Sequence, residues 1–180
     1  MRPLTVVGHD DGGGLPYRRD VPQVEWPEIR GPWSASTVHR FLDGAVIPMR
    51  IGVEAPSGWP LVLSLWFIPD GLELLGATRP DSVLVRCLER RPRCSFEVAA
   101  DAPPYRGVRG RARVELDRAQ GGATLDRLLE RYLGSATNPL GERLRARAAD
   151  EVCLRLAPVS LTSWDYGPRM ASSLTESPER

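Results

Sequence analysis

The sequence contains no lysine, and all 24 of its basic residues are arginine. A Schiff-base enzyme, a P-loop nucleotide hydrolase and a Ser/Lys hydrolase each need an amino group at a defined position, so these mechanisms are excluded in their usual form. Histidine is scarce as well, because only His9 and His39 are present and they lie far apart in the chain. A histidine-based metal site and a Ser/His/Asp triad have no support, and we expect no metal site.

Long apolar runs and cysteine motifs are also missing. No run of about 18 consecutive apolar residues occurs, and the segment from Met1 to Asp10 lacks the charged start and apolar stretch of a secretion signal. The cysteines Cys87, Cys94 and Cys153 match no C-x-x-C pattern and lie in apolar periodic segments, which favours buried thiols. These absences predict a cytoplasmic protein that makes no membrane contact.

The charge of the chain is nearly balanced, since 23 acidic residues leave a net charge of +1. Such a chain has no overall field that would gather nucleic acid or an anionic membrane, so we expect no nucleic-acid partner, and any anion site must be local. A length of 180 residues is enough for one well-buried core and short for two. A single folded domain is therefore expected.

Proline and glycine gather in residues 1–33, which show no apolar period and are predicted to form an extended arm. Trp26 and Trp33 lie in this arm, and two such large apolar rings favour packing against the rest of the domain or against a partner subunit. Residues 34–170 are predicted to form the folded domain, and residues 171–180 a disordered tail.

Segments of alternating and of helical period follow one another in the folded part. The alternating segments predict six strands, at 47–54, 61–67, 72–78, 93–99, 106–116 and 152–164. The helical segments predict short helices, at 34–44, 80–91, 121–134 and 138–144. No regular strand–helix–strand alternation is present, so an antiparallel barrel, which closes its own edges, accounts for this order better than a doubly wound sheet. The predicted fold class is mainly β with short helices.

The clearest alternation lies in residues 106–116, where one face carries Arg109, Arg111 and Arg113 and the other is apolar. No aromatic residue is interleaved with these arginines, so the stacking platform of a single-stranded nucleic-acid site is missing. A solvated or dimer-facing stripe is favoured over a ligand clamp.

Several short segments, in order and spacing, resemble a known family. Residues 91–95, "RPRCS", resemble the "dPRvs" strand of the pyridoxamine 5'-phosphate oxidase and flavin/deazaflavin oxidoreductase superfamily, and residues 110–112, "GRA", resemble its G-x-A element. Trp164 and Arg169 resemble the closing tryptophan of the family and the arginine five positions later. The resemblance covers roughly residues 45–170 and implies a six-stranded antiparallel split β-barrel of the FMN-binding type.

The resemblance also implies a function. The family members are homodimers with one flavin mononucleotide (FMN) in each of two grooves at the interface, so we expect a homodimeric flavin- or deazaflavin-dependent oxidoreductase acting on a small organic substrate. The cofactor-binding residues expected on this basis are Ser64, Thr78, Arg79, Ser82, Arg106, Trp164 and Arg169. Among them, Thr78 and Ser82 offer hydroxyls, Arg79 offers a bidentate guanidinium, and a helix starting at Pro80 offers free N–H groups to a phosphate. The alternative is that Thr78 only caps the helix and that Arg79 is solvated. No catalytic residue is assigned, because a flavin carries the hydride itself.

Four positions depart from the family pattern. Val62 and Phe67 on the strand pair, and Val83 and Leu84 at the following helix, stand where basic phosphate ligands are expected. Four apolar residues cannot neutralise a phosphate, so FMN would be held by Arg79, Arg106 or Arg169 instead, or the groove takes the deazaflavin F420, haem or a less charged molecule. The alternative hypothesis is a split barrel that has lost flavin redox chemistry and serves as a ligand-binding protein, or that uses the groove for haem or a cofactor-independent reaction.

Overall fold

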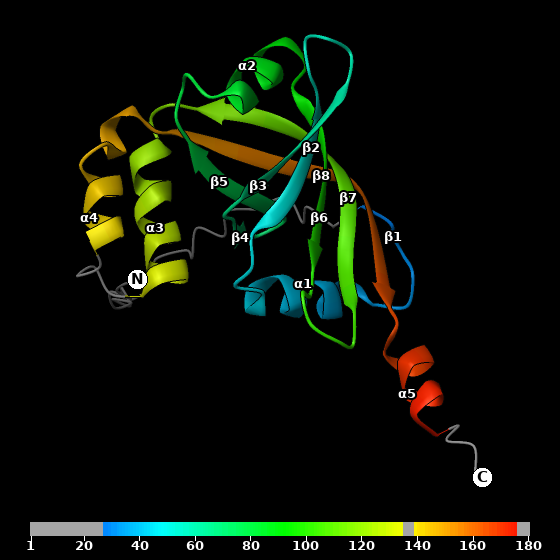
Figure 1. The fold of residues 1–180 in the computed structure, drawn as a ribbon. Coiled ribbons are helices and arrows are strands. Elements are labelled where there is room, and N and C mark those ends of the chain that lie inside the picture. Colours follow the sequence, from blue (N-terminus) through cyan, green and yellow to red (C-terminus); the bar gives the residue numbers. More distant parts are fainter. Residues whose placement is uncertain (1–26, 135–138, 176–180) are drawn as a thin grey trace, which may run out of the picture.

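One strongly curved sheet forms the body of the protein (Figure 1). The computed structural model describes residues 27–134 and 139–175, with side chains up to residue 171. The strands are β1 (Ile29–Arg30), β2 (Met49–Glu54), β3 (Pro60–Leu65), β4 (Ile68–Asp70), β5 (Glu73–Thr78), β6 (Arg93–Ala99), β7 (Arg106–Asp117) and β8 (Val152–Asp165). The helices are α1 (Ala35–Gly44), α2 (Val83–Arg90), α3 (Gly121–Leu133), α4 (Pro139–Arg145) and α5 (Gly167–Thr175), with a 3-10 turn at Ala148–Asp150.

The strands follow the order β3-β2-β6-β7-β8-β5-β4, and β1 pairs with β8. All six predicted strands are present, as β2, β3 and β5 to β8, so the mainly β class is confirmed. The count of six is corrected to eight, because the two- and three-residue strands β1 and β4 are too short to show a period. Two further features differ from a closed antiparallel barrel: β1 runs parallel to β8, and no pairing joins the end strands β3 and β4 within the described residues.

The two ends of the folded domain are also placed. Residues 1–26 of the predicted arm lie outside the described residues, while β1 joins the sheet and Trp33 packs against Phe41 with ring centroids 5.0 Å apart. The backbone N–H of Trp33 donates to Ser163 Oγ at 3.0 Å. At the other end, α5 extends away from the sheet (Figure 1) and includes residues 171–175 of the predicted tail. Residues 176–180 lie outside the described residues.

The main core lies inside the curved sheet, where the alternate residues of each strand point inward. Its largest fully buried side chains are Phe67, Leu42, Met49, Ile51, Leu74, Leu88, Leu154, Leu156, Leu161 and Val38. Helix α1 covers one end of this core and α2 the other (Figure 1). The three cysteines are free and buried as predicted, and burial raises the pKa of Cys94 to about 12, so this thiol stays protonated at neutral pH.

The sequence predicts the start of helix α1 correctly but not the start of helix α2. Helix α1 begins as expected, with the Ser34 side chain accepting from the N–H of Thr37 at 3.3 Å. Helix α2 begins at Val83 rather than at Pro80, because Ser82 is its N-cap and accepts from the N–H of Val85 at 3.2 Å. No helix among the described residues has the length and apolar character needed to cross a membrane.

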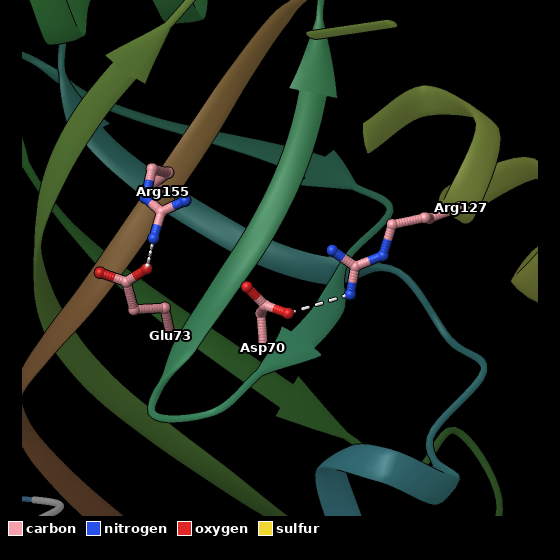
Figure 2. Close-up of polar contacts among 4 residues, drawn as sticks. All are labelled: Asp70, Glu73, Arg127 and Arg155. Carbon is pink, nitrogen blue, oxygen red and sulfur yellow. Dashed lines mark hydrogen bonds and ion pairs between the residues drawn. The ribbon is translucent and has the colours of Figure 1, made fainter. Parts of the chain in front are cut away.

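A second core forms where α3 packs on the outside of β4, β5 and β8. Leu128 of α3 is buried there with Ile68, Leu75 and Cys153. Two ion pairs hold the same elements together at the surface, as Figure 2 shows. Asp70 at the end of β4 faces Arg127 of α3 at 3.0 Å, and Glu73 at the start of β5 faces Arg155 of β8. The β4–β5 hairpin is therefore fixed on both of its sides.

Candidate cofactor-binding groove

The outer surface of the sheet carries two rows of side chains that run across five strands. Side chains alternate along a strand, so the residues before and after an inward-facing residue such as Ile51 or Phe96 point outward. The first row, in strand order from β3 to β8, consists of Ser64, Arg50, Glu97, Arg109 and Thr162. The second row consists of Val62, Gly52, Ser95, Arg111 and Ser160.

A groove of about 690 Å³ lies along these two rows. Gly52 forms part of its floor, since a Cβ atom there would lie 2.7 Å from Ser95 Oγ. Val159 stands on the rim beside Arg111, because the β7–β8 register shifts between Arg111 and Ala112 and leaves Val159 as an extra, half-exposed residue. The volume lies in the range of sites for small ligands and cofactors.

The lining of the groove is cationic. Four arginines, Arg30, Arg50, Arg109 and Arg111, face two glutamates. Arg50 donates to the carbonyl of Pro48 at 3.1 Å and Arg111 donates to Ser160 Oγ at 3.1 Å. None of the four makes an ion pair with a carboxylate within the described residues. Glu97 is the register partner of both Arg50 and Arg109, so it offsets part of this charge. Guanidinium groups that keep N–H donors in a concave surface are suited to an anionic ligand.

Two of the predicted cofactor-binding residues lie on this face. Ser64 ends the first row next to Arg50. Trp164 is two positions beyond Thr162 on β8 and packs over Gly107, with its ring 5.2 Å from that of Tyr166. The buried Nε1 of Trp164 has no hydrogen-bond partner within the described residues. Both residues therefore border the groove, although neither is part of its lining.

Arg106 and Arg169 lie elsewhere at the same end of β8. Arg106 pairs with Asp165 in the register and lines a separate cavity of about 640 Å³ between α1 and the β6–β7 connection. Trp33 and Phe41 form the aromatic part of that cavity. Arg169 is exposed on α5. Neither arginine reaches the groove lining within one chain.

The other three predicted residues, Thr78, Arg79 and Ser82, lie at the far end of β8. Thr78 pairs with Val152, so about twelve residues, or roughly 40 Å along an extended strand, separate it from Trp164. Arg79 forms an ion pair of 2.5 Å with Asp81, and both side chains are more than half exposed. A single chain thus does not bring the seven predicted residues together.

The surface around Arg79 is nearly neutral. The cavity there, of about 530 Å³, is lined by Arg79 and Arg147 together with Asp81 and Asp150. The helix that was expected to present free N–H groups begins only at Val83 and is capped by a side chain, as described above. The groove offers an anion more uncommitted positive charge than this loop does.

A testable consequence of this loop concerns Glu151, which is 8% exposed. Burial raises its pKa, with Asp150 acting in the same direction and Arg79 in the opposite one. A carboxyl group whose pKa is raised by folding destabilises the folded state when it is ionised. The free energy of unfolding should therefore increase as the pH falls from 7 and Glu151 becomes protonated. We expect Glu151→Gln to raise the melting temperature at pH 7 and to leave it unchanged at pH 4. A lower melting temperature of the variant at pH 7 would contradict this.

Comparison with known proteins places the fold. No family model and no curated protein sequence matches the chain. Solved structures do match it. An F420 reductase is 25% identical with a TM-score of 0.60, over 73% of this chain and 98% of that one. A conserved hypothetical protein from Mycobacterium tuberculosis is 20% identical with a TM-score of 0.62, over 83% and 92%. A pyridoxamine 5'-phosphate oxidase-like protein from Listeria innocua is 12% identical with a TM-score of 0.55, over 71% and 95%.

The curved sheet with helices at both ends matches a split-barrel fold, with a cationic groove on its outer face. In fold, the chain is similar to proteins of the pyridoxamine 5'-phosphate oxidase-like split-barrel superfamily. The family resemblance seen in the sequence is thereby confirmed.

Proposed function

We propose that the protein is an oxidoreductase that binds FMN or the deazaflavin F420 in the groove and passes a hydride to or from a small organic substrate. The observation that carries this proposal is the set of four groove arginines, none of which makes an ion pair among the described residues. Both cofactors combine a planar ring with an anionic chain, and guanidinium groups bind such anions through paired N–H donors. The likeness to an F420 reductase supports the deazaflavin in particular.

The groove residues have defined tasks in this proposal. Arg50, Arg109 and Arg111 bind and orient the anionic part of the cofactor, while Val62 and Val159 exclude water from one side of its ring. The bound cofactor supplies the hydride chemistry, so no protein acid or base is required. Val62 fits a ring contact better than a phosphate contact, because its side chain is apolar and 64% exposed on the groove face.

The departures from the family pattern agree with a phosphate bound at this groove. Phe67 is fully buried and Leu84 is 3% exposed, so neither position can face a ligand. The guanidinium of Arg131 lies 5.6 Å from the centre of the Phe67 ring, which places Phe67 in a structural contact. The anion is therefore assigned to arginines on the outer face of the sheet and not to these positions.

We also propose that the protein is a homodimer, as the family resemblance implies. Exposed apolar side chains include Val62 at 64% and Val159 at 50% in the groove, and Trp59 at 76% in the β2–β3 turn. A partner subunit would cover them and complete the site with residues from the other end of its own β8. We expect light scattering at micromolar concentration to give twice the chain mass of 19.9 kDa. A value of one chain mass would contradict the dimer.

Titration tests the proposed function. FMN, F420 and haem are added separately to the purified full chain, and binding is followed by absorbance and by quenching of cofactor fluorescence. We expect saturable binding of FMN or F420, followed by substrate-dependent reoxidation of the reduced cofactor. Failure of both to bind would overturn the proposal, and haem binding alone would assign the groove to haem.

A second candidate is a split barrel that binds its ligand without redox chemistry. It is favoured by the four apolar residues at the family's phosphate-ligand positions. The same titration separates the two candidates, because this one predicts tight binding with no turnover of the reduced cofactor for any small organic acceptor.

A further inference from the structure

Two arginines face each other directly across two neighbouring strands. Arg93 of β6 is the register partner of Arg113 of β7, and Arg111 is the next outward residue on β7. Like charges placed directly opposite each other destabilise a sheet. Neither Arg93 nor Arg113 makes an ion pair with a carboxylate within the described residues. The nearby Glu54 is already paired with Arg91.

Arginines elsewhere on the surface are paired in a different way. Arg118 lies 3.1 Å from Glu89, and Arg127 lies 3.0 Å from Asp70. The chain thus supplies carboxylate partners for other surface arginines. Arg93 and Arg113 have no carboxylate partner among the described residues, although the repulsion between them would make such a partner especially favourable.

The pair also lines a cavity on the exposed face of the sheet. A cavity of about 800 Å³ is lined by both residues, and four arginines face a single glutamate in it. This cavity shares Gly52, Ser95 and Arg111 with the groove described above, so the two form one continuous channel across β2, β6 and β7. A ligand bound in the groove can extend to the pair.

We propose that Arg93 and Arg113, with Arg111 beside them, form a binding site for a phosphate-class dianion at this end of the channel. Two opposed guanidinium forks can each donate two hydrogen bonds to one tetrahedral anion, and the anion removes the repulsion between them. The anion site itself does not depend on the proposed function. Only the identity of the molecule that carries the anion rests on it. With that function, the anion is the phosphate group of the cofactor, and free phosphate has the same chemistry.

The test uses Arg113→Gln in the full chain, with Arg90→Gln, an exposed arginine of α2 outside the channel, as the control. Melting temperatures are measured with and without pyrophosphate at a constant ionic strength set by sodium chloride. Without pyrophosphate, relief of the repulsion should raise the melting temperature of Arg113→Gln by about 1–3 °C. Pyrophosphate should stabilise wild type and Arg90→Gln, while Arg113→Gln should bind it roughly 10- to 150-fold more weakly.

Two results would overturn the site: no stabilisation of wild type by pyrophosphate beyond that of chloride, or a full pyrophosphate response in Arg113→Gln. The source of the anion follows from FMN and riboflavin, which differ by the phosphate. Loss of FMN affinity with unchanged riboflavin affinity in Arg113→Gln assigns the cofactor phosphate to the pair. If the FMN and riboflavin affinities change equally in Arg113→Gln while pyrophosphate binding is lost, the pair binds a free anion. Wild type that binds pyrophosphate here but no flavin or deazaflavin refutes the proposed function and leaves the anion site standing.

Discussion

Gly52→Leu is expected to lower cofactor affinity at least about 100-fold while the protein still folds. Gly52 lies on the groove floor, and an added Cβ would meet the Oγ of Ser95 at 2.7 Å, a side-chain atom that can rotate away, and the backbone oxygen of Ser95 at an ordinary 3.9 Å. The backbone at Gly52 does not have a positive φ, so leucine fits the strand conformation. The leucine side chain then occupies the space of the ligand. Cofactor titration gives the affinity, and thermal unfolding followed by circular dichroism checks the fold.

The matched control is Glu115→Leu, an outward position on the same sheet beyond the groove. It adds a leucine to the outer face without filling the groove, so cofactor affinity should not change. Unchanged affinity in Gly52→Leu, with the protein folded, would mean that the cofactor does not lie over β2 and β6.

Arg131→Met is expected to lower the free energy of unfolding by about 2–4 kcal/mol. The guanidinium of Arg131 on α3 donates to the carbonyls of Leu42, Asp43 and Ala45 at 2.8–2.9 Å. These carbonyls close the C-terminal end of α1, where a cation is favourable. The variant leaves them without their donor and also removes the cation over the ring of Phe67.

Arg131→Lys is the matched variant, because it keeps the charge and loses the planar fork. Its loss of stability, measured by urea unfolding, should lie between wild type and Arg131→Met. A loss below about 0.5 kcal/mol in Arg131→Met would show that water replaces these three hydrogen bonds without penalty.

Tyr132, the next residue, also connects α3 to the sheet, since its hydroxyl donates to the carbonyl of Ile47 at 2.9 Å and accepts from the N–H of Phe67 at 3.3 Å.

The strands were predictable where inward residues alternate with outward ones, as in β7, where Val108, Ala112 and Val114 are buried and Arg109 is exposed. The start of α2 was not predicted correctly. Pro80 suits the first turn of a helix, but Ser82 competes as an N-cap and determines the start. Strand β1 has only two residues and is stabilised by its parallel pairing with β8, a contact between distant parts of the chain that no local pattern indicates.

The groove was only half visible in the sequence. Arg109 and Arg111 were recognised as sharing a face, and a solvated or dimer-facing stripe was expected. Their role depends on Arg50 and Gly52, which come from a distant strand and reach the same surface only through the pairing of β2 with β6. A missing carboxylate partner is likewise a property of the folded surface. The expected site around Arg79 depended on a helix start that the capping residue moved.

The most direct test of the groove as the cofactor site compares Arg111→Ala with Arg79→Ala in one cofactor titration. Arg111 lines the groove without a carboxylate partner, while Arg79 lies at the opposite end of β8 and is paired with Asp81. Loss of a charge-assisted hydrogen bond should weaken cofactor binding roughly 10- to 150-fold in Arg111→Ala. Arg79→Ala should bind as wild type does. The reverse pattern, with Arg79→Ala weakened and Arg111→Ala unchanged, would contradict the account and place the anion at the loop between β5 and α2.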